Sequence, residues 1–385
     1  MKKQLTVALG LAVLATPAFA SKARLQALGE DVNGSFYVND NRNIFLNSAH
    51  VNNHKDLVTF EWGNTTNGGD NAATPRAEGG VFRAHNNMVW GLYLGSESNT
   101  SNAFRAVGTG NATNAANAAA LQEQNNIDLF VGGDAGVKWG ANVTYTKSDK
   151  NEVVGDAETS AIRTRFGVIA GDIEGWANIN VSNKAELGAN EFEGKLGYKV
   201  GAIYNMNDYR IFADYQSFDG EGSVGANDFD LKSNQLQVGA GRVTKLNDKA
   251  SLFTRAQFTM VKAENEGSTG NLSATCGGGS LALGCEEYES MSVPVVIGLE
   301  YDAASWLVLR TSVAQAIWGK EESKDTKRGL QETTTVNAGA TLKFGELSVD
   351  GVIGNNAGAA PGSETNAGQL NTDTLMSRVS MTYRF

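Results

Sequence analysis

Polar and apolar residues alternate along most of this chain with a period of two, which is the period of a β-strand with two different faces. The segment 135–147 shows the pattern, with Trp139 and Val143 on one face and Lys138 and Asn142 on the other. Similar runs of about 9 to 13 residues recur along the chain, whereas strands of soluble sandwiches average about 5 to 6 residues. These lengths suit tilted strands that cross a bilayer.

The runs predict sixteen strands, which we place approximately at 56–62, 79–86, 88–96, 126–132, 135–147, 159–170, 173–182, 191–205, 208–217, 231–244, 250–263, 288–301, 305–318, 332–344, 346–354 and 374–385. Each odd strand is followed by a long polar loop, as at 98–125, 264–287 and 355–373, and each even strand by a tight turn, as at 205–208. Short turns at one end and long loops at the other are typical of outer-membrane barrels. A soluble all-β secreted protein, the competing interpretation, predicts no such alternation of loop lengths.

We therefore expect an all-β fold, a transmembrane antiparallel β-barrel of about sixteen strands over residues 55–385, with fourteen or eighteen strands as alternatives. The barrel has short periplasmic turns and long external loops. One of these loops, from Ser96 to Asn125, is long enough either to fold inward and narrow the pore or to form an external flap.

Residues 1–20 have the features of a secretory signal peptide. Lys2 and Lys3 form a charged start, an apolar stretch follows over 5–16, and Ala18-Phe19-Ala20 forms a small-x-small cleavage site before Ser21. No later apolar run reaches 18 residues, so a membrane role requires a barrel. We expect export to the outer membrane of a Gram-negative cell.

Composition narrows the function classes. The 385 residues carry 32 Lys and Arg against 42 Asp and Glu, and this net charge of −10 excludes a basic nucleic-acid binder. The two cysteines, Cys276 and Cys285, fall in one external loop and predict a local disulfide. The chain has 3 histidines, and we expect no metal, no cofactor and no enzymatic activity. His50 and His54 have a spacing that a metal-binding helix could use, but their surroundings favour a loop.

What the barrel encloses decides its function. Sixteen strands enclose more volume than side chains can fill, so the lumen is expected to hold water. Charged side chains are costly on the lipid face, and the strand pattern assigns many of them to the lumen. The predicted pore-lining residues are Arg83, Lys138, Arg163, Arg165, Lys195, Lys199, Arg210, Arg255, Arg310, Lys343, Arg378, Glu193, Asp214 and Glu300.

Residues 21–54 do not fit the strand count. A short helical turn is expected at 23–28, and the segments 36–38 and 44–46 could pair as a small hairpin. Three placements stay open: the segment lies in the periplasm, adds two strands to the barrel, or enters the lumen as a plug. A plug would change the function from open diffusion to gated or hydrophobic-substrate uptake.

The last strand, 375–385, alternates apolar residues and ends with Tyr383 and Phe385 on one face. It resembles the C-terminal signature of Gram-negative outer-membrane β-barrels, and the whole layout resembles the porin family. The stretch 41–49 is similar to a major outer-membrane porin-like protein of a predatory bacterium. The resemblance implies that Tyr383 and Phe385 form the signal for the barrel-assembly machinery. It also implies a homotrimer in a bilayer that contains lipopolysaccharide.

The function expected from these features is passive diffusion of ions and small hydrophilic solutes through an outer-membrane porin. Two alternatives remain: a plugged barrel for gated or hydrophobic-substrate uptake, and a structural or surface-interaction outer-membrane protein.

Overall fold

The computed structural model describes residues 21–63, 77–96, 125–152, 155–188, 190–224, 227–267, 287–323, 326–329, 334–356 and 378–385. The expected signal peptide, the pair Cys276 and Cys285, and positions 97–124 of the long third-to-fourth-strand loop lie outside these residues. Among the described residues, three short helices precede the strands: α2 (Lys22–Ala27) and the 3₁₀ helices η1 (Asn41–Phe45) and η2 (Ser48–Asn53). No helix among the described residues is long and apolar enough to span a membrane.

The strands in the described part of the chain all belong to one antiparallel sheet. They are β1 (Leu57–Gly63), β2 (Glu78–His85), β3 (Met88–Leu94), β4 (Ile127–Asp134), β5 (Lys138–Glu152), β6 (Gly155–Ala170), β7 (Ile173–Leu187), β8 (Asn190–Gly194), β9 (Gly197–Met206), β10 (Tyr209–Val224), β11 (Asn227–Asn247), β12 (Ala250–Gly267), β13 (Glu287–Ala304), β14 (Leu307–Ser323), β15 (Thr326–Gly329), β16 (Thr334–Phe344), β17 (Leu347–Asn356) and β18 (Arg378–Arg384).

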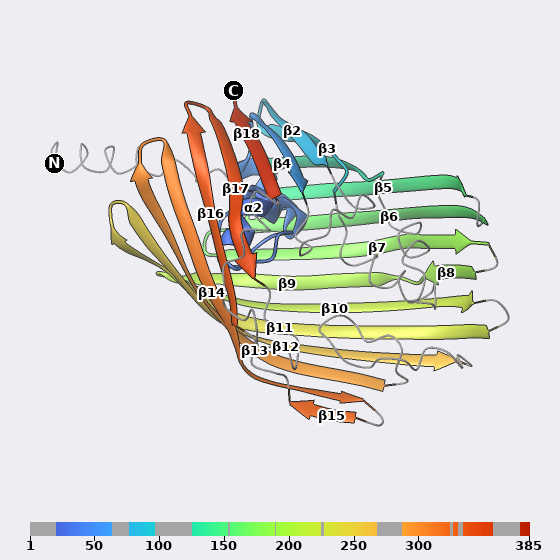
Figure 1. Cartoon of the computed structure of the whole chain (residues 1–385). Helices are drawn as coiled ribbons and strands as arrows, with labels where there is room; N and C mark the ends of the chain where they lie inside the picture. The colour runs from blue at the N-terminus through green and yellow to red at the C-terminus, as the bar shows by residue number, and fades with distance from the viewer. Residues whose placement is uncertain are drawn as a thin grey trace.

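The sheet closes into a barrel because β1 pairs with both β2 and β18 (Figure 1). Its 18 strands fill sixteen positions around the wall. Strands β8 and β9 share the position between β7 and β10, and β15 and β16 share the position next to β14. The expected sixteen-stranded antiparallel barrel is therefore confirmed.

Turns of two residues, or three between β4 and β5, join the strands at one end of the barrel. Several place a residue in the left-handed region, including Asn86 and Asn207 with φ of 54° and Gly171 with φ of 57°. Glycine and asparagine are the residues that adopt this conformation most easily, and turns of this kind match the twist of the strands they join. Asparagine and glycine in the turns thus determine where the strands reverse direction at this end of the barrel.

Several strands extend further than the alternation indicated. β5 and β6 stay paired up to Glu152 and Gly155, so the long loop expected between them is largely β-hairpin. β11 reaches 21 residues. Strands of this length exceed what a hydrocarbon core requires, and the surplus forms a longer wall at the end opposite the tight turns (Figure 1).

The wall has an apolar outer face and a polar inner face. On β4, Leu129 is 59% exposed, whereas its neighbour Asp128 is fully buried. On β6, Phe166 and Val168 are exposed and Arg165 is buried. An exposed apolar surface of this kind suits contact with lipid, and buried polar side chains on the opposite face belong to an interior.

The interior is occupied by residues 21–54, hereafter the plug. α2 lies within the ring of strands in Figure 1, and it contacts β14, β16, β17 and β18. η2 contacts β3, β4, β5 and β6, on a different part of the wall. Of the three placements considered for this segment, the structure has the lumenal one.

Candidate functional site

Apolar side chains pack the plug against the inner wall in two clusters. In the first, Leu25, Tyr37 and Val38 of the plug meet Trp176 and Phe212 of the wall. The second joins Ile44 and Val51 of the plug to the wall residues Leu57, Phe82, Val89, Tyr93 and Phe130. Burial of these side chains removes apolar area from water, which stabilises the plug inside the barrel.

Side-chain caps shape the three short helices of the plug. The Ser21 hydroxyl accepts a hydrogen bond from the Arg24 N–H at the start of α2. Asp40 and Asn47 accept from the backbone at the starts of η1 and η2. Two wall glycines make room for η2: a Cβ on Gly140 would collide with the Ser48 carbonyl, and one on Gly167 with the Asn47 side chain.

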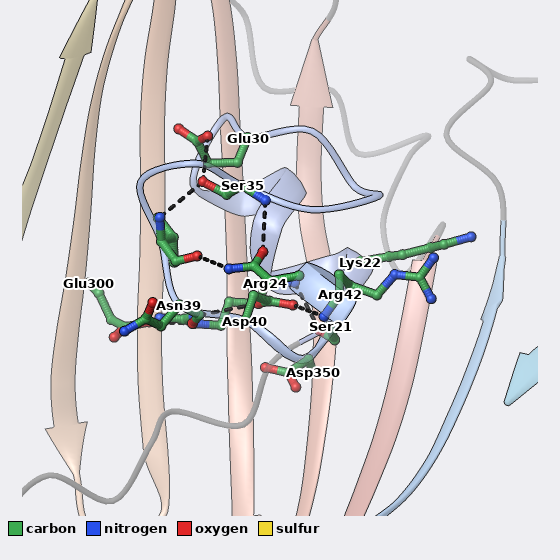
Figure 2. A network of polar contacts seen from close by, with 12 residues as sticks. Ser21, Lys22, Arg24, Glu30, Ser35, Asn39, Asp40, Arg42, Glu300 and Asp350 are labelled. Atoms are coloured by element: carbon green, nitrogen blue, oxygen red, sulfur yellow. Dashed lines mark hydrogen bonds and ion pairs between the residues drawn. The ribbon is translucent and has the colours of Figure 1, made fainter. Parts of the chain in front are cut away.

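A buried chain of alternating charges joins the plug to one side of the wall (Figure 2). Arg24 Nη1 lies 3.2 Å from Asp40 Oδ2, and Arg24 Nε lies 3.1 Å from Glu300 Oε2 on β13. Arg310 on β14 also contacts Glu300, at 2.5 Å, and its Nη1 lies 3.1 Å from Asp350 Oδ1 on β17. Each buried charge therefore has an opposite charge beside it, which offsets the cost of removing it from water.

A second cluster joins the plug to β1 and β2. The ammonium group of Lys22 contacts Glu78, and the Lys22 N–H donates to Glu61 Oε2 over 2.9 Å. Arg42 Nη1 lies 3.3 Å from Glu78 Oε2 and donates to the Tyr93 hydroxyl over 2.7 Å. All five side chains are buried, so the plug supplies the cations and the wall supplies the carboxylates.

Glu174 on β7 provides a third connection. Its carboxylate lies 2.8 Å from His50 Nε2 of the plug and 2.6 Å from Arg210 Nη2 on β10. Arg210 also donates to Asn39 Oδ1 of the plug over 3.0 Å. The wall thus meets the plug on strands from several parts of its circumference.

The fourth connection has the opposite polarity. Glu30 of the plug lies 2.6 Å from Arg255 Nε on β12, and Arg255 Nη2 donates to the Gly29 carbonyl over 3.0 Å. The Ser35 hydroxyl donates to the second oxygen of Glu30 over 2.9 Å. Here the plug supplies the carboxylate, so the plug fits the wall by a pattern of both charges.

Burial changes the titration of the plug. It raises the pKa of Glu30, and it raises the pKa of Asp40 to about 7 although the Arg24 charge lowers it. Burial lowers the pKa of His54 to about 3, so this imidazole is neutral at ordinary pH. The charge on Asp40 therefore depends on pH near neutrality.

A cavity of about 470 Å³ remains between the plug and the wall. The plug lines this cavity with residues 30, 31, 33–36, 45 and 46, and the wall lines it with residues of β6, β7 and β9 to β13. Its polar lining side chains include Arg163, Arg165, Asn178, Asn180, Lys199, Gln216, Gln235, Gln237, Arg255 and Gln257. The lining of this cavity thus combines charged and carboxamide side chains with apolar ones such as Phe36, Phe45 and Leu46 of the plug.

Most of the predicted pore-lining residues lie on the inner face. Arg165, Arg210, Glu300 and Arg310 take part in the buried contacts of the interior, and Lys138 Nζ donates to Asn53 Oδ1 of the plug over 2.7 Å. The other residues on this face are Arg163, Lys199, Asp214, Arg255, Lys343 and Arg378. Their role in lining a conducting pore stays a prediction.

Three predicted residues lie on the outer face instead. Arg83 alternates with the buried Phe82, is 66% exposed at its side chain, and lies over the Phe385 ring at 4.9 Å. Glu193 pairs with the exposed Lys184, and Lys195 with the exposed Glu221. The pore-lining prediction was wrong for these three residues.

An irregularity in the wall explains two of these errors. The register of β6 with β7 shifts after Ile162, and the next strand breaks into β8 and β9 at Lys195 and Leu196. One extra residue moves every later side chain to the other face. The continuous strand expected at 191–205 therefore placed Glu193 and Lys195 on the same face as Lys199.

Sequence reasoning missed the plug residues Lys22, Arg24, Glu30 and Arg42 and the wall residue Glu78. The signal that could have found them is charge: a short segment that fits no strand carries several charged residues next to capping residues. His50 lies against Glu174, and within the described part of the chain no group of three or more His, Cys, Asp or Glu side chains is placed to hold a metal ion. Tyr383 and Phe385 lie exposed at the end of β18, with ring centroids 6.4 Å apart.

Comparison with known proteins adds distant structural similarities. No protein-family model matches the chain, and no curated protein matches it. OmpT, an outer membrane protein of Vibrio cholerae, is similar with 12% identity and a TM-score of 0.37 over 86% of this chain and 95% of that one. The toluene transporter TodX of Pseudomonas putida is similar with 12% identity and a TM-score of 0.34 over 96% and 99%. CdiB from Acinetobacter baumannii has 12% identity and a TM-score of 0.42 over 86% and 59%.

Proposed function

We propose that the protein is an outer-membrane channel for small polar solutes whose lumen is restricted by its own N-terminal plug. The observation that carries the proposal is the set of buried ion pairs between residues 21–54 and the wall. Solutes cross unchanged and no chemical step is involved. The apolar outer face of the barrel supports a place in a membrane, and strands are the elements that cross it.

The proposal joins two of the three functions that the sequence left open, the diffusion porin and the plugged barrel. The polar inner wall favours hydrophilic solutes, as for a diffusion porin, because apolar solutes gain little from a lining of amides and charged groups. The plug favours gating. A plug bound by several buried charges is expected to be released only part of the time, since each broken pair leaves a charge without its partner.

Planar lipid bilayers provide the test. The full chain should show low current with rare openings. A Glu61→Gln/Glu78→Gln variant should open at least about tenfold more often, because Lys22 and Arg42 lose their carboxylate partners and a tenfold change requires only about 1.4 kcal/mol. The matched control is Glu158→Gln/Glu193→Gln, which neutralises two carboxylates in exposed pairs and should leave the current unchanged.

Deletion of residues 21–54 removes the plug and therefore gives the largest conductance that the barrel can show. It should give large, steady conductance steps. Steps of the same size from the undeleted protein would contradict gating and leave an open diffusion porin. If neither protein conducts although both are shown to be folded, the structural or surface-interaction role would be the remaining interpretation.

A further inference from the structure

The cavity of about 470 Å³ is the second distinctive feature of the lumen. Its volume falls within the range of about 300–1,000 Å³ that small-molecule sites occupy. The register of the sheet places five of its side chains in one row on consecutive strands. In order, they are Arg165, Asn178, Lys199, Gln216 and Gln235.

Carboxamides are the commonest polar side chains of this lining. Gln237 lies on the same face of β11 as Gln235, Gln257 lies on β12, and Asn180 lies on the same face of β7 as Asn178. Each carboxamide offers hydrogen-bond donors and acceptors together. A site of this kind suits a ligand that both donates and accepts at every position, as hydroxyl groups do.

The side chain of Asn180, beside the cavity, has hydrogen-bonding groups that a ligand or a water molecule could satisfy. It is 6% exposed, and neither its amide nitrogen nor its carbonyl oxygen has a hydrogen-bond partner among the described residues. The Asn178 nitrogen donates to the Leu46 carbonyl over 3.2 Å, but its side-chain oxygen also lacks such a partner. Buried polar groups without partners are rare in folded proteins.

The charges around the cavity are already compensated. Arg165 lies 3.1 Å from Asp128, Lys199 lies 3.4 Å from Asp214, and Arg255 lies 2.6 Å from Glu30. The lining also holds Arg163 and, on the plug, Asp31, one formal charge of each sign. An anionic solute would have to displace these carboxylates, so a neutral ligand fits better.

We propose that this cavity is a binding site for a neutral, hydroxyl-rich solute, a sugar of mono- to disaccharide size. The ligand takes hydrogen bonds from the carboxamides of β7, β10, β11 and β12, and the partly buried Phe36 of the plug offers an apolar edge. This inference rests on the proposed function, whose solute class it specifies. Since the plug forms part of the site, a bound sugar contacts plug and wall together.

Isothermal titration calorimetry tests the proposal on the full chain. The protein is refolded in a zwitterionic detergent without a sugar headgroup and titrated with glucose, maltose, sodium succinate and toluene. A saturable heat with glucose or maltose is expected. Saturable heat with succinate or toluene alone would overturn the proposal, and so would the absence of heat with every probe in protein shown to be folded by its gel mobility.

Two variants identify the site. Asn180→Leu and Gln216→Met remove carboxamides from the lining and should each weaken sugar binding at least about fivefold, as expected for a lost hydrogen bond. Asn337→Leu is the matched control: this buried carboxamide on β16 bonds to Ser312 and does not line the cavity, and sugar affinity should stay unchanged. Equal weakening in all three variants would overturn the assignment to this cavity.

Equilibrium binding separates this inference from the proposed function. Sugar binding that is lost in Asn180→Leu supports the site even when the bilayer recordings show no gating. Gated currents without sugar binding would overturn the sugar site and leave the gated channel intact.

Discussion

Arg24 and Glu300 are separated by 276 positions in the sequence, and yet Arg24 Nε donates to Glu300 Oε2 over 3.1 Å inside the barrel. Glu300 also binds Arg310, so one wall carboxylate holds a cation of the plug and a cation of the wall. The Arg24 and Arg310 guanidinium groups share the single negative charge of Glu300. Removal of that charge therefore weakens the binding of the plug to the wall directly.

Glu300→Gln should therefore loosen the plug. The substitution leaves two buried guanidinium groups without their shared carboxylate, and breaking a buried pair of this kind costs about 3–5 kcal/mol. We expect lower stability in urea unfolding and more frequent channel openings. Glu289→Gln on the same strand is the control, because its carboxylate pairs with Lys262 and Lys320 nearer the surface. An equal effect of both substitutions would contradict the role of Glu300.

Gly241→Val should displace the plug by collision. A Cβ at Gly241 would overlap the Tyr37 ring, whose body packs on this part of β11. We expect trypsin to cleave after Arg42 of the plug at least about tenfold faster, since a release that is favoured by about 1.4 kcal/mol exposes this buried bond ten times more often. Mass spectrometry of the fragments measures the rate.

Gly175→Ala is the control for this collision. The nearest atom to its new Cβ is Val168 Cγ2 at 3.6 Å, an ordinary contact. Cleavage after Arg42 should keep the rate of the unchanged protein. Unchanged cleavage in Gly241→Val as well would show that the plug does not depend on this close approach.

The binding of the plug inside the barrel should weaken as pH rises from about 4 to about 7. The pKa of Asp40 is about 7 in the seated plug because of burial, against an ordinary value near 3.8. The seated state therefore binds the proton more tightly, and stability is lost as this proton leaves. We expect openings to increase from pH 4.5 to pH 7.5. Asp40→Asn removes this titration, and an unaltered pH dependence in that variant would exclude Asp40 as its source.

Leu129→Arg should impair insertion into lipid. Leu129 lies on the outer face of β4 and is 59% exposed. An arginine on the lipid face costs about 2–4 kcal/mol near the middle of the bilayer and about 0–1 kcal/mol near its edge. Leu246, next to the tight turn between β11 and β12, is the control, and Leu246→Arg should have little effect. The yield of refolding into lipid vesicles, measured at a series of urea concentrations, gives the effect of each substitution.

Alternation and turn chemistry made most of the fold predictable. A period of two specifies which side chains face lipid, and asparagine or glycine in the tight turns specifies where strands reverse. The break at Lys195 and Leu196 was not predictable in this way, because one extra residue leaves the local composition unchanged while it reverses the faces of the strand.

The candidate site was predictable only on its wall side. Lys199, Arg210, Arg255 and Glu300 follow from strand alternation, since charges avoid the lipid face. Their partners in the plug do not follow from any local pattern. Glu30 and Arg255 are 225 positions apart, and only closure of the barrel around the plug brings them together.

The plug runs into β1 with only a few residues between Asn53, where η2 ends, and Leu57, where the first strand begins. A released plug therefore stays attached to the mouth of its own barrel. Its return is an intramolecular reaction, with an effective concentration on the order of millimolar for a short tether. A separate peptide with the sequence of residues 21–54 should compete for the lumen only above that concentration, and each opening should be reversible without any other component.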